Sequence, residues 1–418
     1  MKVKLPYGKS FLRIKVPKNS DVLLPVPASA IKDINKYAHT ALSATGEYNT
    51  IRKMLKPYSS IAIIVNDITR PTPTRDIISW LHELLSGIPD PQVKIVIATG
   101  SHRSNTVDEL RAMLGNDIVS RFKIINHDAF DDATLLYAGK TTTGAPVYLN
   151  RDYCEADIRI VTGFIEPHFF AGFSGGPKSI MPGIAGIESI MHFHNATRID
   201  HPKSTWGVLE DNPVQDMAVE TAMMMKPHLS VNVALNSRKE ITGIFAGDVI
   251  ASHRKGAEFV SKHAMLQCSG NYDLVITTNS GYPLDQSLYQ SVKGMSAAAG
   301  IVKKGGIILC VAECSDGIPD HGEFGQMLTE SRAPLDLLSM IRQDGYSRYD
   351  QWQAQALCKI LDKASVYLYS SLPPETVKNV HLSPCDNVQN CIDTILSKHD
   401  DYSVAVLPEG PMVIPYIE

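Results

Sequence analysis

The chain has 418 residues, a length typical of two or three domains, and carries a net charge of −4. With 44% hydrophobic and 20% charged residues, it can bury large cores and is not a disordered chain. The charge excludes the basic surface typical of nucleic-acid binders, and the apolar runs are far shorter than the about 20 residues of a membrane span. Seven scattered cysteines without a C-x-x-C motif argue against disulfides and a cysteine zinc site. Because the N-terminus lacks a signal segment, we expect a cytoplasmic protein that binds neither nucleic acid nor membrane.

After a predicted hairpin in the first 25 residues, one unit recurs along the chain: a short apolar run, a polar loop and a helical stretch. Thr106 and Glu109 form a potential capping box, Gly115 is a helix stop, and Asp76 is a candidate N-cap. This alternation of strands and helices predicts parallel sheets covered by helices. Strands are expected at residues 60–65, 93–98, 158–162, 274–277, 307–312, 365–369 and 403–407, and helices at 76–86, 106–114, 250–265 and 285–299.

A domain boundary is expected at Cys268-Ser269-Gly270-Asn271, between a helical stretch and a new strand. We therefore predict two α/β domains with mainly parallel sheets, residues 1–268 and 269–399, with an active-site cleft between them. Residues 400–418 form a tail that could pack back on the first domain.

The loops that follow the predicted strands carry acid/base groups and cations. Asp67 and Arg70 follow the first strand, His102 the second, and Glu166 and His168 the third. Ligands bind beyond the carboxyl ends of the strands in open α/β sheets, and histidine titrates near neutral pH. Two histidines there suit general acid/base work from opposite sides of a substrate. Taken singly, the Asp–Arg pair also fits an ion-paired turn, and each histidine a hydrogen-bonded structural role.

The densest stretch of small residues is residues 172–179, which includes Ser174, Gly175, Gly176 and Lys178. Glycines allow the backbone to approach a ligand closely, and Pro177 suits the first residue of a helix. A helix N-terminus with a lysine in its first turn favours phosphate. Neither the Walker nor the Rossmann glycine pattern is met, so the stretch is a different phosphate cradle or a tight turn.

Helical spacing places His194 on one apolar face with Ile187, Ile190 and Met191, whereas His192 projects elsewhere. His194 is therefore a candidate ligand or a buried structural histidine. A zinc site built from His192, His194 and His201 remains open on spacing alone.

In the second half, the predicted helix 285–299 has an apolar stripe and a polar face that carries Tyr289, Gln290 and Lys293. This face is either a solvated surface or a wall that recognises an anion. Trp352 lies in a polar context and is either an aromatic anchor or part of a lid.

Together these motifs resemble the lactate racemase family, the nickel-pincer-nucleotide-dependent racemases and epimerases of 2-hydroxyacids. The resemblance extends over most of the chain and keeps the family's order. The matching residues are Asp67-x-x-Arg70-Pro71, Thr99-Gly100-Ser101-His102-Arg103, the run from Glu166 to Lys178, His194, Tyr289-Gln290-x-x-Lys293 and Asp350-Gln351-Trp352.

The resemblance implies an isomerase with a pyridinium-3-thioamide-5-thiocarboxylic acid mononucleotide attached to Lys178 and holding Ni(II), with His194 as the protein's nickel ligand. It further implies that His102 and His168 are the acid/base pair. Cofactor-binding residues would include Ser174, Gly175, Gly176 and Asp67, and substrate-binding residues Arg70, Tyr289, Gln290, Lys293 and Trp352.

The implied mechanism removes the hydroxyl proton while the C2 hydrogen leaves as hydride, and the planar 2-keto acid then takes the hydride back on either face. Proteins that make the cofactor would be needed for activation, and the oligomeric state is open. Some lactate-acting members have an arginine where this chain has Pro167, which leaves malate, longer hydroxyacids and aldonates open as substrates. The rival hypotheses are a zinc-dependent hydrolase and a non-catalytic carboxylate- or phosphate-binding protein.

Overall fold

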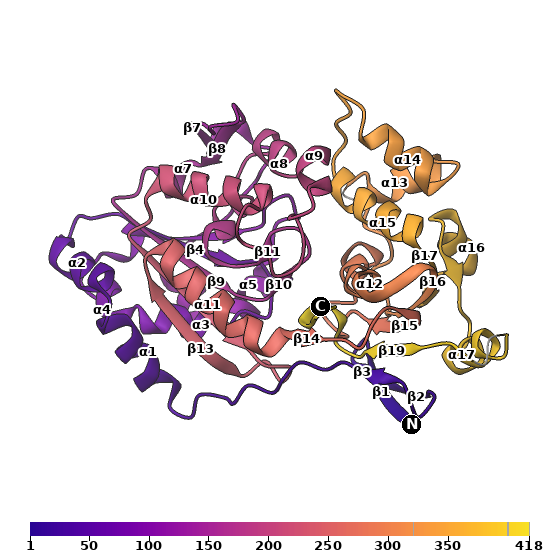
Figure 1. The fold of residues 1–418 in the computed structure, drawn as a ribbon. Coiled ribbons are helices and arrows are strands. Elements are labelled where there is room, and N and C mark those ends of the chain that lie inside the picture. Colours follow the sequence, from indigo (N-terminus) through magenta and orange to yellow (C-terminus); the bar gives the residue numbers. More distant parts are fainter. Residues whose placement is uncertain (321, 399–400, 418) are drawn as a thin grey trace. The chain divides into compact units, whose positions relative to one another are not determined.

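The computed structural model describes residues 1–320, 322–398 and 401–417. The chain folds into two compact units, one of residues 27–261 and one that combines residues 1–26 with 262–418. Each unit contains a parallel-rich sheet (Figure 1), which confirms the predicted fold class of two α/β domains. The division differs from the expected one, because the first 26 residues belong to the second unit.

In the unit of residues 27–261 the strands lie in the order β13-β12-β9-β4-β5-β6, and every neighbouring pair is parallel except β12 and β13. The central strands are buried on both faces, as expected of strands written as unbroken apolar runs. The strands are β4 (Ile61–Asn66), β5 (Val93–Ala98), β6 (Lys123–Asn126), β9 (Ile158–Phe164), β12 (Leu229–Leu235) and β13 (Ile241–Gly247).

The helices of this unit follow local sequence signals with one exception. The capping box of Thr106 and Glu109 and the stop at Gly115 are confirmed. The prediction of one helix over residues 76–86 is wrong. The structure has two short helices there, which are separated at Leu81, and the first of them already begins at Thr74. The helices are α1 (Ile34–Ser43), α2 (Gly46–Met54), α3 (Thr74–Trp80), α4 (His82–Leu85), α5 (Val107–Leu114), α6 (Asn116–Arg121), α7 (Arg151–Cys154), α8 (Ile187–Phe193), α9 (Ala196–Asp200), α10 (Pro213–Met225) and α11 (Val249–Ala264).

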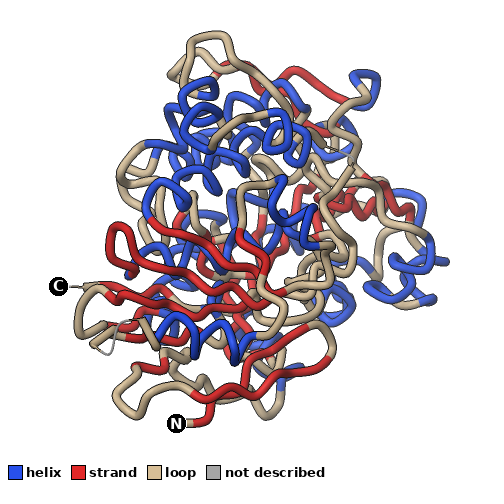
Figure 2. The backbone as a smooth tube through the Cα atoms, turned by 90° about the vertical axis from the view of Figure 1, so that its right-hand side faces the viewer, coloured by secondary structure: helices blue, strands red, loops and turns tan. Residues whose placement is uncertain are grey.

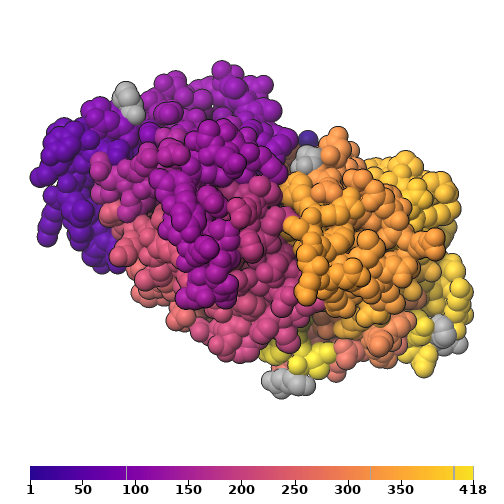
Figure 3. Space-filling model, turned by 90° about the horizontal axis from the view of Figure 1, so that it is seen from above, coloured from indigo at the N-terminus to yellow at the C-terminus, as the bar shows by residue number. Residues whose placement is uncertain are grey.

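Two small antiparallel ribbons complete this unit. The first is the hairpin of β7 (Leu135–Lys140) and β8 (Pro146–Asn150), which has the violet colour of its residue numbers in Figure 3. Tyr137 of this hairpin is exposed. The second ribbon pairs β10 (Pro167–His168) with β11 (Gly172–Phe173) directly after β9.

The second unit has an entirely parallel sheet in the order β18-β17-β16-β15-β19-β3. The expected tail belongs to this second unit: Val404–Leu407 pairs with β15, and Ala405 pairs with Asp21 near the N-terminus. This pairing satisfies the backbone hydrogen bonds of the strand edge beside β15. The strands are β3 (Asp21–Val22), β15 (Tyr272–Thr278), β16 (Val302–Val311), β17 (Ala364–Tyr369), β18 (Ser383–Pro384) and β19 (Val404–Leu407), and β14 (Met265–Gln267) pairs separately with β20 (Ile414–Tyr416).

Both faces of this sheet are covered. The hairpin of β1 (Lys2–Tyr7) and β2 (Ser10–Lys15), beside the sheet in Figure 2, packs its apolar side with α17 (Val388–Leu396) against one face. On the other face lie α12 (Leu288–Ile301) and α15 (Gln351–Lys363). The remaining helices are α13 (Phe324–Glu330), α14 (Pro334–Ile341) and α16 (Pro374–Asn379). In the part of the chain that the structure describes, no helix is both long and apolar enough to span a bilayer.

Candidate active site

The strand order of the first unit explains why its chemical groups gather. From β4 the sheet grows to one side through β5 and β6, and to the other through β9 and β12. The loops that leave β4 and β9 therefore diverge at a topological switch point, where open α/β sheets bind their ligands. Asp67 and Arg70 follow β4, His102 follows β5, and His168 and Lys178 follow β9, so these predicted site residues lie at one edge of the sheet.

His102 is held by a buried carboxylate. Its Nδ1 lies 2.8 Å from Oδ2 of Asp67, whose other oxygen accepts a hydrogen bond of 2.7 Å from Thr69 Oγ1. Burial raises the pKa of Asp67, but the opposing effects of His102, Arg70 and the Thr69 hydroxyl outweigh it and lower the pKa below its usual value. An ionised Asp67 thus orients the ring, and Nε2 is the atom left to exchange a proton with a substrate.

Arg70 places a cation beside this pair. Its Nε lies 3.8 Å from Oε1 of Glu166, and its Nη1 donates to Thr69 Oγ1 at 3.5 Å. The Arg70 side chain is 20% exposed and that of Glu166 is 10% exposed. A guanidinium in such partial burial can hold a carboxylate strongly, because few waters compete for it.

His168 is fixed by the main chain on one side. Its Nδ1 faces the backbone N–H groups of Phe170 (3.2 Å) and Ala171 (3.3 Å), which fix the orientation of the ring. Nε2 lies 3.2 Å from Nζ of Lys178. Phe169 and Phe170 stack on each other beside the ring, with centroids 3.8 Å apart. The structure thus joins one predicted acid/base histidine to the predicted attachment lysine.

The Gly-rich stretch forms a tight turn and not a long helix. Pro177 is the second residue of a single 3-10 turn, Gly176–Ser179, which corrects the expected helix start and its phosphate-binding N-terminus. Gly175 and Gly176 have φ of 77° and 52°, a region that favours glycine. Ser174 Oγ donates to Phe164 O (2.7 Å) and accepts from Glu166 N (3.0 Å), so it closes the loop.

His194 and His192 differ as the helical spacing predicts. His194 follows the last turn of α8 and is 8% exposed, whereas His192 is exposed. Burial, together with the charge of Lys178, lowers the pKa of His194 well below its usual value. Its imidazole is therefore neutral at pH 7, the form that binds a metal ion.

A protein-only zinc site is not supported. Among the described residues, no three His, Cys, Asp or Glu side chains converge as metal ligands. A zinc hydrolase centre of His192, His194 and His201 would need such a cluster. His194 offers one neutral imidazole, a ligand that both zinc and nickel accept.

The predicted residues of the second half lie in the second unit. Tyr289, Gln290 and Lys293 are on α12, which follows β15 where that sheet reverses its order between β15 and β19. Lys293 Nζ donates to Gln290 Oε1 at 2.7 Å. Tyr289 Oη accepts from Trp352 Nε1 at 2.9 Å, which places the tryptophan of α15 beside the tyrosine.

Asp350 is a residue that the sequence analysis did not select. It is 3% exposed, and its Oδ1 accepts a 3.2 Å hydrogen bond from Tyr289 Oη. Burial raises the pKa of Tyr289 well above its usual value, and the Asp350 carboxylate raises it further, so the phenol keeps its proton. The signal was its place immediately before Gln351-Trp352 in a motif already noted.

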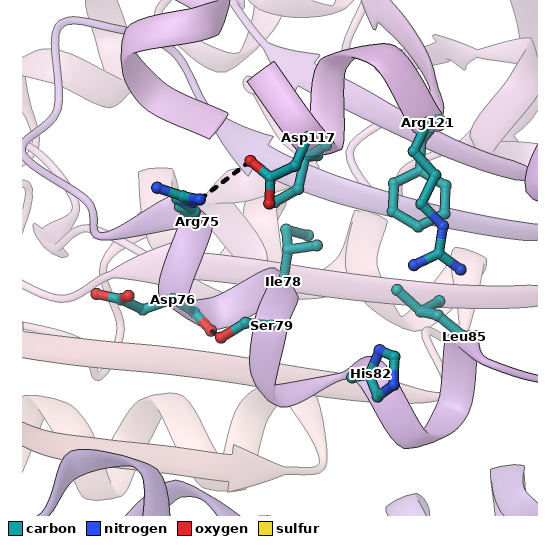
Figure 4. Close-up of a pocket in the computed structure, with 10 residues that line it drawn as sticks. Arg75, Asp76, Ile78, Ser79, His82, Leu85, Asp117 and Arg121 are labelled. Atoms are coloured by element: carbon teal, nitrogen blue, oxygen red, sulfur yellow. Dashed lines mark hydrogen bonds and ion pairs between the residues drawn. The ribbon is translucent and has the colours of Figure 1, made fainter. Parts of the chain in front are cut away.

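A surface pocket of about 420 Å³ lies among α3, α4 and α6 (Figure 4). Its two arginines form ion pairs, Arg75 with Asp117 at 3.1 Å and Arg121 with Asp90 at 2.8 Å. Leu85 and Arg121 end helices that lead into β5 and β6, so this side of the pocket is near the amino ends of the strands. It is therefore distinct from the edge that carries His102 and His168.

His127, also missed from the sequence, yields a pH prediction. It is 1% exposed, donates from Nε2 to Ala185 O at 2.9 Å, and burial lowers its pKa to about 4. Since an unfolded histidine titrates near 6.5, only the unfolded chain takes up this proton between pH 6.5 and 4, and stability falls as the pH falls. Denaturant unfolding should show that His127→Gln removes on the order of 3 kcal/mol of this loss. The exposed control His82→Gln should leave the pH dependence unchanged, and an equal effect of both variants would contradict the prediction.

Two family models match the chain: the lactate racemase N-terminal domain over residues 7–207 and the lactate racemase C-terminal domain over residues 268–415. The chain belongs to the lactate racemase family. It is 36% identical to the lactate racemase of Thermoanaerobacterium thermosaccharolyticum over 99% of this chain and 98% of that protein. It is also 36% identical to the lactate racemase of Lactiplantibacillus plantarum over 87% of both chains.

Solved structures agree with this membership in an isomerase family. The lactate racemase apoprotein from T. thermosaccharolyticum superimposes with a TM-score of 0.90 at 34% identity, covering 99% of this chain and 100% of that one. A protein from Thermotoga maritima is similar in fold alone, with a TM-score of 0.71 at 18% identity over 95% of this chain and 100% of that one.

Proposed function

We propose that this member of the lactate racemase family racemises or epimerises a 2-hydroxycarboxylic acid, with His102 and His168 as its acid/base pair and a nickel-pincer nucleotide attached to Lys178. The contact of 3.2 Å between His168 Nε2 and Lys178 Nζ carries the proposal, because it brings a proton-transfer group to the proposed attachment point. Family membership supports the activity, and the buried neutral imidazole of His194 supports the cofactor.

The chain's residues fit such a group. Lys178 would hold it covalently, His194 would supply the nickel with a neutral imidazole, and the backbone of Gly175 and Gly176 would let it approach closely. When bound, the group supplies a reversible acceptor for the hydrogen on C2 of the substrate. Ser174 and Asp67 already bond Phe164, Thr69 and His102, so they would shape the site from behind.

Proton transfer and substrate binding would be carried out by the chain's own side chains. His102 Nε2, oriented by Asp67, would take the hydroxyl proton of one enantiomer, and the His168 ring would serve as the acid/base group for the other. Arg70 would hold the substrate carboxylate, which fixes C2 between the two rings. In the second unit Lys293 and Gln290 offer a cation and an amide that suit an anion, and Tyr289 and Trp352 form an aromatic pair.

The direct test is a racemisation screen on protein produced together with cofactor-making proteins. D and L forms of lactate, malate, longer hydroxyacids and aldonates are each incubated with the loaded chain, and chiral chromatography follows the second stereoisomer. We expect one class to interconvert in both directions. Because Pro167 is buried in β10 directly before His168, Pro167→Arg tests whether this position shifts the preference toward lactate. Tight binding without interconversion of any acid would favour the rival carboxylate-binding protein.

Nickel retention separates the neighbouring histidines. His194→Ala should lose most of the nickel from loaded protein, because it removes the buried neutral imidazole. His192→Ala should keep it, since that side chain is exposed on the same segment. Plasma mass spectrometry of the metal per chain measures both, and equal loss in the two variants would refute the assignment.

A further inference from the structure

We propose that Asn232 and His253 are positioning residues that fix the turn of Ser174, Gly175 and Gly176 and thereby set where Lys178 presents its amine. The inference deepens the proposed function, on which it rests only for the attachment of the cofactor. Neither residue belongs to a sequence motif noted above, and both are buried beneath the turn.

Asn232 holds the turn by one backbone group. It is fully buried on β12, paired in register with Gly163 of β9, and its Oδ1 accepts from Gly176 N at 2.9 Å. Its Nδ2 donates to Ser230 Oγ at 2.8 Å, so the amide orientation is fixed. A Cβ atom on Gly163 would lie 2.8 Å from Oδ1, and one on Gly175 3.0 Å. The two glycines therefore make the room that this amide needs.

His253 holds the same turn by a second group. It is 1% exposed on α11, and its ring lies 2.9 Å by Nε2 from the carbonyl oxygen of Ser174. A carbonyl can only accept, so Nε2 carries the hydrogen, and burial keeps the ring neutral by lowering its pKa to about 4. A Cβ atom on Gly176 would lie 2.6 Å from His253 Cβ, so the histidine seats directly against the glycine.

These two contacts reach Lys178 through the backbone. Lys178 N donates to Gly175 O at 3.1 Å, and Ser179 Oγ donates to Thr162 O at 3.0 Å. Glycines with positive φ are free to adopt many other conformations, so side chains that bond the turn must select this one. The selected turn directs the Lys178 side chain so that its Nζ contacts His168 Nε2. Asn232 and His253 thus act on the amine through the backbone of the turn.

The experiment uses the full chain in two arms. The first measures hydrogen exchange of the segment 174–178 in the unloaded protein, with β4 as internal reference. Asn232→Ala and His253→Phe each remove one buried hydrogen bond, and we expect about tenfold faster exchange of this segment alone. His253→Gln, which can donate an amide hydrogen, should restore part of the protection. His228→Phe is the matched control, since that half-buried histidine also bonds backbone, four residues before Asn232 on the chain.

The second arm follows the mass of the covalent adduct during loading. Asn232→Ala and His253→Phe should form the adduct about tenfold more slowly, and His253→Gln should restore part of the rate. The control His228→Phe should form the adduct at the rate of the unaltered chain. Unchanged exchange and unchanged loading in both variants would overturn the inference. If the phenylalanine does not fit, His253→Leu takes its place in the same test. If the unaltered chain never gains mass, cofactor attachment fails, while the exchange arm still decides whether these residues fix the turn.

Discussion

Replacement of His168 or His102 by glutamine is expected to slow racemisation by roughly 10²–10⁴-fold in both directions. In the proposed mechanism each direction uses one ring as base and the other as acid, so neither could replace its partner over a full cycle. For enantiomers the equilibrium constant is one, so the two directions must fall by the same factor. Initial rates from each pure enantiomer measure this, with the exposed His201→Gln as control.

A single-turnover version of this experiment distinguishes the two rings. Each variant should still convert to 2-keto acid the enantiomer whose base survives, and rapid acid quench followed by chromatography detects that product. Since Asp67 orients only His102, Asp67→Asn should impair the same enantiomer as His102→Gln. Full racemase activity in either single histidine variant would refute the two-base mechanism.

Lys178→Ala is expected to abolish activity and the covalent adduct together. Intact-mass measurement of loaded wild-type protein should show one added cofactor mass, which the variant lacks. Lys178→Arg, which keeps a cation beside His168, should also lack the adduct, because a guanidinium does not form the same bond. The exposed Lys255→Ala is the control and should carry a full adduct. An active enzyme with an unmodified mass would remove covalent attachment from the proposal.

The sheets could be predicted because the sequences of their central strands are unbroken apolar runs. Residues 93–98 match β5 at both ends, and the capping box of Thr106 marks α5 correctly. The break at Leu81 was not predictable, because the apolar spacing continues through it. The sequence also did not indicate that the N-terminal residues belong to the second unit, because β3 is only two residues long and its partner β19 is near the other end of the chain.

The site could be predicted in part for a similar reason. His102, His168 and Lys178 follow strands, so position alone brings them to one edge of the sheet. The hydrogen-bond partners of these side chains, in contrast, depend on tertiary contacts that the sequence does not reveal. The contact of Asp67 with His102, for example, follows from the folded structure and not from a pattern in the sequence. The buried supports Asn232 and His253 bear no motif, because one polar residue within an apolar strand or helix gives no pattern.

The pairing of β3 with β19 has a consequence for synthesis on the ribosome. The unit of residues 27–261 is continuous in sequence, so all of it is available to fold while the rest of the chain is still being made. Asp21 and Val22 must wait for Ala405 and Val406, which emerge about 20–80 s later at elongation rates of 5–20 residues per second. Until β15 and β16 have been made, the first 26 residues, with their apolar hairpin side, have no sheet to cover. Nascent chains halted before residue 272 should therefore expose this segment to proteases and chaperones, whereas release of the finished chain should shield it.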